Sequence, residues 1–342
     1  MNSSTVSETK RIALACNPAI PYGFLDETTM WAYGWLIFIA VINIVACPLT
    51  AVMNALVIIA VKTKHRLKTK SNIALACLST TDLTMGVIGQ PAFIAWVIAQ
   101  LQGNTSSTYC MKTVLSRLAL RVLGSLTLSH LAMVHVERYI AIKHSLQDET
   151  IVTEDRLVCF STLFWIILLP LIVPFSFLGD KIISIIVDVI ILSLFIATVF
   201  VCQVVLYYET SRRKKQIATQ QVSSEAREKF LRENKAFKLT ATVLFCLILC
   251  YLPLVVVVVT LPSNFFRNSV NLGYTALSTG LTAAVFNSVV NPFIYCASIR
   301  QFRVAFIQLV FRKSNADAEN MEKRAFGRLN RVVLPHQEGS QE

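Results

Sequence analysis

Long apolar stretches recur seven times along the chain and alternate with short polar segments. An α-helix rises about 1.5 Å per residue, so about twenty apolar residues suffice to cross a hydrocarbon core of roughly 30 Å. The pattern therefore predicts an all-α membrane protein, a seven-transmembrane helix bundle. The helices are expected at about residues 32–61, 72–100, 111–142, 157–178, 182–208, 236–261 and 270–296.

A mostly apolar stretch without proline runs from Cys110 to Lys143 and carries the charged triplet Glu137, Arg138 and Tyr139 near its end. A buried arginine costs about 2.5 to 3.5 kcal/mol on insertion scales, so Arg138 is expected at the far membrane face. Two interpretations remain open for it. It either reaches water as a simple anchor, or it makes a contact that switches.

An amphipathic pattern follows the seventh stretch, at residues 298–312, and its apolar and basic side chains take opposite faces of a helix. They are Phe302, Phe306, Leu309 and Val310 against Arg300, Arg303 and Arg312. We expect an eighth helix along the cytoplasmic membrane face. The remaining domains are an extracellular tail at 1–31, the seven-helix domain at 32–297 and a disordered cytoplasmic tail at 313–342.

The composition also indicates a polytopic membrane protein, because 54% of the residues are hydrophobic and only 15% are charged. The mean hydropathy of +0.58 is too high for a water-soluble domain of this length. A net charge of +12 could indicate nucleic acid as a partner. The basic residues stand in short blocks between the apolar stretches, however, so no nucleic acid is expected.

The basic blocks also predict the orientation, because short cytoplasmic loops are enriched in Lys and Arg. Most of the 32 Lys and Arg fall in segments 62–71, 143–156, 209–238 and 297–342. The amino terminus is then extracellular and the carboxyl terminus cytoplasmic, in a multi-pass protein of the plasma membrane. The polar start predicts no cleavable signal peptide, and the glycosylation sequons at Asn2 and Asn104 fall outside.

Seven of the nine cysteines lie within or at the ends of apolar stretches, where a thiol is a small apolar filler. Cys16 and Cys110 face the oxidising side. We expect these two to form a disulfide bond, and two free thiols are the alternative.

Polar residues within the stretches are candidate functional residues. Asp82 lies deep in the second stretch, where an ionisable group must pair, take up a proton or bind a cation. A structural polar pin is the alternative. Pro253 is expected to bend the sixth helix, and the basic stretch 209–235 before it either binds anionic lipid headgroups or docks a partner.

Taken in order, with each motif on its own stretch, these residues resemble a rhodopsin-like (class A) G-protein-coupled receptor over about residues 30–312. The motif residues are Asn54, Leu78, Asp82, Glu137-Arg138-Tyr139, Trp165, Cys250-Tyr251-Leu252-Pro253, Asn291-Pro292-Phe293-Ile294-Tyr295 and Phe302. The second outer loop without cysteine and the fifth helix without proline resemble the branch of melanocortin, lysophospholipid, cannabinoid and adenosine receptors.

The resemblance implies an activation switch. At rest Arg138 pairs with Glu137 and reaches Glu233, and activation swings helix six outward. Arg138 then meets Tyr295 and a tyrosine of helix five. The switch residues are Glu137, Arg138, Tyr139, Glu233, Tyr207, Tyr208, Tyr251, Pro253, Asn291, Pro292 and Tyr295.

The resemblance also implies an allosteric sodium ion and no other cofactor. Its site would comprise Asp82, Thr127, Asn287, Ser288 and Asn291. Sodium there would stabilise the resting form by binding it preferentially.

The resemblance to this family also excludes some ligand classes, because key residues of the outer pocket differ. Leu120 stands where amine receptors keep an acid, Val285 where opsins keep the retinal lysine, and Val258 where adenosine receptors hold an asparagine. The expected pocket is an apolar cup that carries two arginines, and its residues are Arg117, Leu120, Arg121, Gly124, Tyr251, Leu254, Val255, Val258 and Leu281.

Arg117 and Arg121 lie one helical turn apart and suit an anionic head, such as a lipid phosphate, a carboxylate or an acidic peptide side chain. An internal ion pair between one arginine and Asp188 is the alternative.

We therefore expect a receptor, not an enzyme, that binds an apolar or anionic lipid-like or peptide ligand and activates a heterotrimeric G protein. Arrestin, a receptor kinase and membrane lipid are further expected partners. A transporter or a seven-span membrane hydrolase is the alternative. His130 and His135 have no carboxylate cluster beside them for a catalytic zinc, and the repeated halves of a transporter are not visible.

Overall fold

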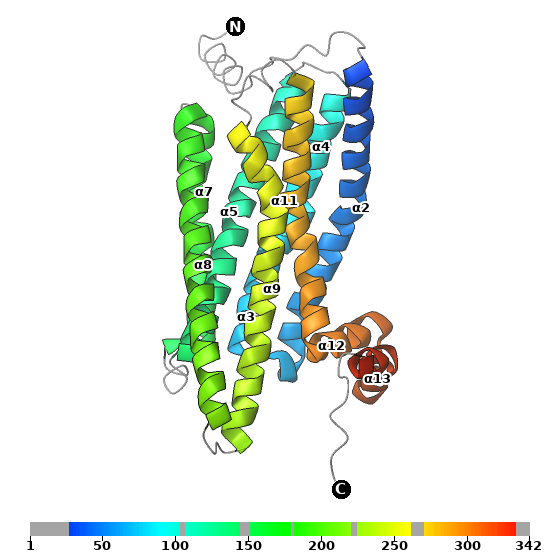
Figure 1. The fold of residues 1–342 in the computed structure, drawn as a ribbon. Helices are drawn as coiled ribbons and strands as arrows, with labels where there is room; N and C mark the ends of the chain where they lie inside the picture. The colour runs from blue at the N-terminus through cyan, green and yellow to red at the C-terminus, as the bar shows by residue number, and fades with distance from the viewer. Residues whose placement is uncertain are drawn as a thin grey trace.

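The computed structural model of the chain describes residues 27–102, 107–143, 151–178, 181–219, 224–260 and 270–332. Long helices lie side by side in one bundle (Figure 1). In chain order they are α2 (Glu27–Thr63), η1 (His65–Leu67), α3 (Lys70–Thr84), η2 (Met85–Gly89), α4 (Gln90–Leu101), α5 (Ser107–Lys143), α7 (Glu154–Leu178), α8 (Lys181–Thr219), α9 (Ser224–Thr260), α11 (Val270–Ser298), α12 (Arg300–Phe311) and α13 (Asn315–Val332).

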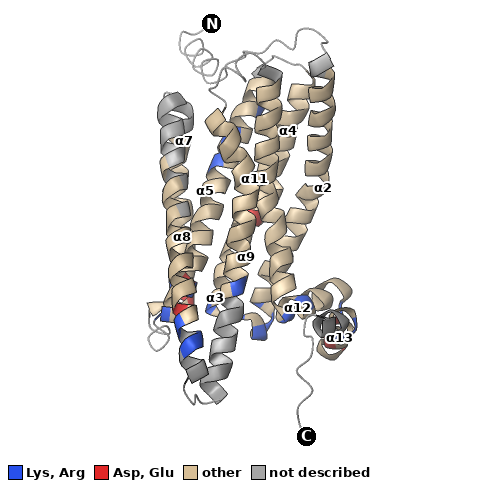
Figure 2. Cartoon of the chain, viewed as in Figure 1, with Lys and Arg blue, Asp and Glu red and all other residues tan. Residues whose placement is uncertain are grey.

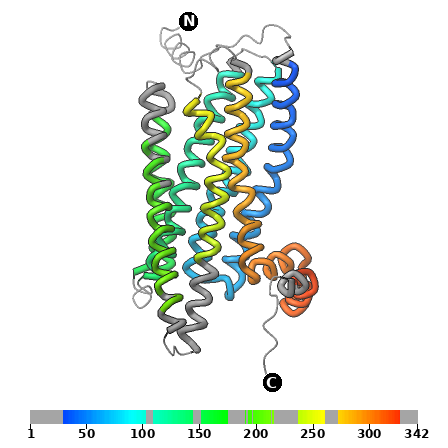
Figure 3. Tube along the Cα trace, viewed as in Figure 1, coloured from blue at the N-terminus to red at the C-terminus, as the bar shows by residue number. Residues whose placement is uncertain are grey.

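Seven helical stretches are long and apolar enough to cross a membrane, so the predicted seven-helix bundle is confirmed. Figure 3 shows α2, α5 and α11 running along the length of the bundle. The stretches are Met30–Thr63, Lys70–Leu101, Tyr109–Lys143, Glu154–Pro174, Ser193–Arg212, Phe237–Thr260 and Leu272–Ser298.

The second spanning helix consists of α3, the π turn η2 and α4 in direct succession. Gly86 in η2 touches the backbone of the first helix, because an added Cβ would lie 2.8 Å from the backbone nitrogen of Ala51. The Cys47 thiol donates to the Gly86 carbonyl at 3.1 Å. Single π turns are often found at functional sites, and this one begins three residues after Asp82.

Helices six and seven also approach each other closely. A Cβ added at Gly280 of α11 would lie 2.8 Å from Cα of Leu254 in α9. Small residues permit such backbone contact between spanning helices, where packing rather than water exclusion drives association.

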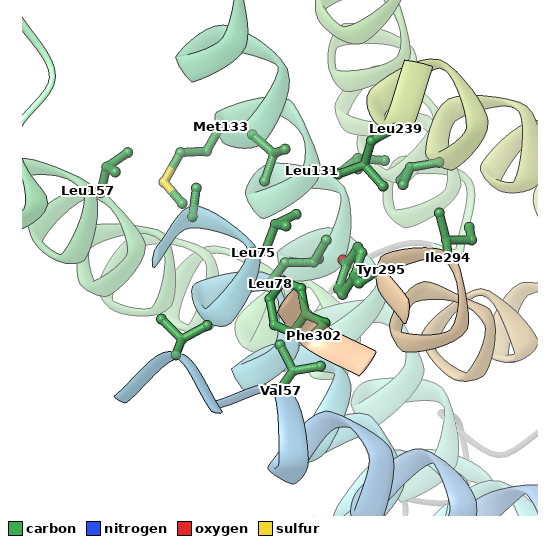
Figure 4. Packing of buried hydrophobic residues seen from close by; sticks show 14 of the residues in the cluster. Val57, Leu75, Leu78, Leu131, Met133, Leu157, Leu239, Ile294, Tyr295 and Phe302 are labelled. Carbon is green, nitrogen blue, oxygen red and sulfur yellow. The ribbon is translucent and has the colours of Figure 1, made fainter. Parts of the chain in front are cut away.

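A buried apolar cluster joins α2, α3, α5, α7, α9, α11 and α12 at the end of the bundle that carries α12 (Figure 4). It includes Val57, Leu78, Leu131, Tyr295 and Phe302. Tyr295 and Phe302 are fully buried, and their rings pack with centroids 6.1 Å apart. The cluster therefore fixes the start of α12 against the end of α11.

The eighth helix expected at 298–312 is present as α12. Phe302 and Ala305 are buried on the apolar face, whereas Val310, which was expected on the same face, is 56% exposed. Arg312 ends the helix with a left-handed φ of 50°, the usual backbone conformation at a helix carboxyl end.

The expected disordered tail at 313–342 is wrong for residues 315–332, which form helix α13 beside α12. Ser314 caps α13: its hydroxyl accepts from the Asp317 backbone N–H at 3.2 Å and donates to the Asp317 carboxylate at 2.7 Å. Reciprocal capping of this kind satisfies a free N–H of the first turn. Residues 333–342 lie outside the described residues.

α13 is fastened to α12 by an ion-pair cluster. Glu322 binds Arg300 at 2.7 Å and Arg303 at 2.8 Å, and the Arg303 guanidinium stacks over Phe326. Arg303 also donates to the Cys296 and Ala297 carbonyls at the end of α11. Many of the lysines and arginines that the structure describes lie at this end of the bundle (Figure 2).

Candidate functional site

Asp82 is the centre of a buried polar site between helices two, three and seven. Its carboxylate accepts hydrogen bonds from Ser288 at 2.6 Å and from Asn291 at 2.8 Å. The Thr127 hydroxyl donates from 3.4 Å. The structure therefore brings together four of the five residues expected at the sodium site.

Asn287 and Asn54 complete the surroundings of this site. Asn54 donates to the Ser288 carbonyl at 3.0 Å, which ties helix one to the site. Asn287 is buried beside Ser288 on the same helix, but no hydrogen bond joins it to Asp82 among the described contacts.

The donor set fits a sodium ion. The amide oxygens of Asn287 and Asn291 are buried without a hydrogen-bond partner in the described structure. Together with the Asp82 carboxylate and the Thr127 and Ser288 hydroxyls, they offer the hard oxygen ligands that such cations prefer. A bound cation would neutralise the buried carboxylate and so stabilise the arrangement that surrounds it.

Glu137 and Arg138 approach each other near the carboxyl end of α5. Their closest approach is 3.4 Å, and the side chains are only 3% and 13% exposed. Ser71 of α3 donates to the other Glu137 oxygen at 2.7 Å. Ser71 belongs to no motif, so sequence reasoning missed it.

The remaining switch residues fall into different environments. The Tyr139 hydroxyl accepts a hydrogen bond from Lys143, one turn further along α5, at 2.6 Å. Tyr207 and Tyr208 are 58% and 68% exposed on α8 and stack edge to face on each other. The side chain of Glu233 lies outside the described ones.

Pro253 and Pro292 both lie inside helices, α9 and α11. Tyr251, two residues before Pro253, is partly buried against the apolar cluster. Its hydroxyl lies 3.8 Å from the position of a Cβ at Gly124. Helices three and six thus come together at Gly124 and Tyr251, two residues of the expected ligand cup.

The outer cup is assembled only in part. Leu120 and Leu281 pack on one apolar cluster with Phe93 and Trp96. Val255 and Val258 are 36% and 38% exposed.

The two arginines of the cup differ in their surroundings. Arg117 is exposed and interacts electrostatically with Tyr274 of α11. Arg121 is half-buried, and the side chain of Asp188 lies outside the described ones.

Cys110 is disulfide-bonded, whereas the seven described cysteines of the spanning helices are free. Cys16, Asn2 and Asn104 lie outside the described residues. The Cys16–Cys110 pairing and both glycosylation sites therefore stay predictions.

A second polar network was not foreseen from the sequence. The Leu126 carbonyl, 2.8 Å from Nδ1 of His130, can only accept, so Nδ1 carries the proton. Nε2 then accepts from the Ser161 hydroxyl at 2.8 Å, and Thr81 lies 3.2 Å from Nδ1. His130 is thus a structural link between helices two, three and four.

Comparison with known proteins agrees with this geometry. The family model "7 transmembrane receptor (rhodopsin family)" matches residues 53–295. The histamine H2 receptor of Cavia porcellus is 25% identical over 327 residues, which cover 86% of this chain and 84% of that receptor. The histamine H2 receptor of Rattus norvegicus is 23% identical over 342 residues, with coverages of 92% and 90%.

The match to the family model extends from the first helix to Tyr295 in the last, and therefore includes Asp82, Arg138 and Pro253. Members of this family are receptors that couple to heterotrimeric G proteins, and they are not enzymes. This chain, a multi-pass membrane protein, belongs to the rhodopsin family of seven-transmembrane receptors.

Proposed function

We propose that this chain is a plasma-membrane receptor, with its amino terminus outside, that activates a heterotrimeric G protein when an extracellular ligand binds. The supporting observation is the buried hydrogen-bonded connection from Asp82 to Ser288 and Asn291. It joins helices two and seven directly above Tyr295, which is buried in the inner cluster. A displacement of the extracellular half of helix seven would therefore be transmitted to the cytoplasmic side, where the G protein binds.

Activation on this proposal moves helix six outward about Pro253. The 3.4 Å Glu137–Arg138 contact supports the resting half of the switch, with Glu233 as the further partner. Because Tyr207 and Tyr208 are exposed, α8 must turn before either can meet Arg138 beside Tyr295. Arrestin and a receptor kinase would bind the cytoplasmic face that the movement of helix six opens for the G protein. Membrane lipid would contact α12.

Nucleotide exchange on purified G proteins tests the receptor function. Membranes that contain the expressed chain should accelerate exchange on at least one G protein of a panel, and Glu233→Ala should raise the ligand-free rate. A transporter or a hydrolase would accelerate exchange on none. Absence of exchange across the panel, with the chain correctly inserted, would refute the proposal.

The ligand class is proposed to be an anionic lipid-like molecule or an acidic peptide. Arg117 and Arg121 on α5 supply two cations beside Leu120, which packs against two apolar clusters. A charge-assisted hydrogen bond contributes about 1.5 to 3 kcal/mol, so Arg121→Gln should reduce potency at least about tenfold. Unchanged potency of the variant at equal surface expression would refute anion binding.

Histamine is the second candidate, because both relatives are histamine H2 receptors. Against it, Leu120 provides no carboxylate for an amine and instead packs in apolar surroundings. Lysophosphatidic acid, oleate and histamine should be compared as agonists in the exchange reaction. Activation by histamine that survives Arg121→Gln would favour the amine.

Sodium is proposed as an allosteric ligand of the Asp82 site. A ligand that binds only the folded state at ten times its Kd adds about 1.4 kcal/mol to the free energy of unfolding. Sodium chloride should therefore raise the melting temperature of the purified chain more than choline chloride does, and Asp82→Asn should abolish the difference. An equal sodium effect in the variant would contradict the site.

A further inference from the structure

A cavity of about 550 Å³ lies at the inner end of the bundle, on the opposite side from the proposed ligand cup. Its walls come from the end of α2, from η1 and from the α12–α13 pair. Figure 1 shows α12 and α13 beside the lower end of α2. The volume is that of a site for a small ligand.

The lining is strongly cationic. Lys64, Arg66 and Arg300 face the cavity, and Glu319 is the one acidic residue among the described lining. Lys64 makes no ion pair with any acidic side chain that the structure describes. Arg66 and Arg300 are 73% and 51% exposed and can still turn donors toward a ligand.

The two guanidinium groups are only partly used by their carboxylate partners. Nη1 of Arg66 binds Glu319 at 3.0 Å, and Nε of Arg300 binds Glu322 at 2.7 Å. Each guanidinium has five N–H donors in a planar fork that matches phosphate oxygens. The acids of α13 therefore stand where an external anion would bind and compete with it.

The floor of the cavity is apolar, and the cavity lies next to the end of the first spanning helix. Leu67 is 1% exposed, and Val304 of α12 lines the same space. Lys64 directly follows the first spanning helix, which ends at Thr63. Basic pockets at this level, next to the hydrocarbon boundary, fit phosphorylated headgroups.

We propose that this cavity binds a multiply charged phosphate ester through Lys64, Arg66 and Arg300, and that Glu319 of α13 competes with it. The phosphate ester is either the headgroup of an inner-leaflet lipid or a soluble molecule of the same chemistry. Such a site would link binding on the inner face to the docking of α13. It does not depend on which ligand the receptor binds outside.

The test uses the full-length chain in detergent micelles and a fluorescent short-chain phosphatidylinositol bisphosphate, with binding followed by anisotropy. One charge near an anionic headgroup contributes about 1 kcal/mol, which is about fivefold in affinity. Lys64→Gln should therefore weaken binding about fivefold. Glu319→Gln should strengthen binding by a similar factor, a gain that misfolding cannot produce.

Lys313→Gln is the matched control, because Lys313 is an exposed cation at the same end of the molecule and outside the cavity. It should change the affinity less than twofold, in keeping with screened surface charges. Equal losses in Lys64→Gln and Lys313→Gln would overturn the proposal in favour of general charge attraction. Weaker binding after Glu319→Gln would overturn it as well.

Competition distinguishes the two sources of the phosphate ester. If inositol trisphosphate displaces the probe with the affinity of the lipid itself, the headgroup suffices and the ligand is a soluble phosphate ester. If the lipid binds more tightly, the acyl chains contribute and the ligand is a membrane lipid. Failure of both to bind in the micromolar range would overturn the proposal.

Discussion

The conformation of the Glu137 side chain depends on a serine from another helix. The Ser71 hydroxyl donates to one carboxylate oxygen at 2.7 Å, whereas Arg138 approaches the other oxygen to 3.4 Å. The buried carboxylate is thus oriented from α3 as well as contacted by the arginine. Ser71 therefore stabilises the Glu137 rotamer in this conformation.

Replacing Ser71 should shift the receptor toward its active conformation. Ser71→Ala removes a hydrogen bond to a charged, buried group, which costs about 1.5 to 3 kcal/mol in this conformation. If the active form lacks the contact, the ligand-free nucleotide-exchange rate should rise at least about fivefold. Thr80→Ala is the control, because Thr80 is exposed on α3 and bonds only to its own helix. An unchanged rate in Ser71→Ala would contradict this role.

The sequence predicted the residues of the Asp82 site better than it predicted the serines that bind Glu137 and His130. Asp82, Ser288 and Asn291 could be placed together because each belongs to a motif with a fixed helix. Ser71 and Ser161 carry no such signal, since a serine on a helix bonds its own backbone as readily as a distant side chain. Their roles follow only from helix packing, which single-sequence periodicity does not determine.

Among the helices, α9 and α11 approach each other so closely that their backbones touch. The Gly280–Leu254 approach leaves no space for a methyl group. Helix six, which the proposed mechanism moves, is therefore positioned by helix seven at Leu254, next to Pro253.

Gly280→Ala should separate these two helices. Overpacking of this kind costs about 1 to 3 kcal/mol, so the melting temperature of the purified chain should fall and ligand-free nucleotide exchange should change. Gly34→Ala is the matched control, because nothing lies within 4 Å of a Cβ at that position. A melting temperature for Gly280→Ala equal to that of Gly34→Ala would show that the two helices yield freely.

Docking of α13 depends on the ionised state of Glu322. Burial alone raises the pKa of this carboxyl, but hydrogen bonds and charge from Arg300 and Arg303 outweigh it, so the pKa is lowered. A lowered folded-state pKa stabilises docking at all pH values above the ordinary glutamate pKa of about 4.3. The stabilisation is lost only as pH falls through the lowered value.

Hydrogen exchange should reveal this dependence. Protection of the α13 amides should stay constant from pH 8 to pH 5 after correction for intrinsic rates, and Glu322→Gln should reduce it about thirtyfold, the equivalent of about 2 kcal/mol. Glu319→Gln should reduce it less than about fivefold, because the Arg66–Glu319 pair is exposed. Equal effects of the two substitutions would contradict the central role of Glu322.

The whole bundle was largely predictable because long apolar runs define spanning helices almost alone. The eighth helix was also predictable, from the spacing of Phe302 and its arginines. α13 was not, because its polar sequence resembles a disordered tail. Its order follows from ion pairs with α12 and from the Ser314 cap, which are contacts between segments rather than properties of one segment.

The expected orientation of the whole molecule is open to a direct test. Peptide N-glycosidase should increase the mobility of the chain expressed in mammalian cells, and Asn2→Gln combined with Asn104→Gln should remove the shift. An epitope tag at the carboxyl end should be stained only after permeabilisation. Staining of the carboxyl-terminal tag in intact cells would contradict the proposed topology.

The π turn at Met85–Gly89 has a consequence for comparison between relatives. Such a turn accommodates one more residue than a regular turn, which rotates everything beyond it by about 100°. Against a relative whose second helix is regular, ungapped numbering from Asp82 would therefore match Phe93 and Trp96 with positions that point elsewhere. A one-residue gap inside the turn restores equivalence, so residue roles in the outer half of this helix transfer only after that shift.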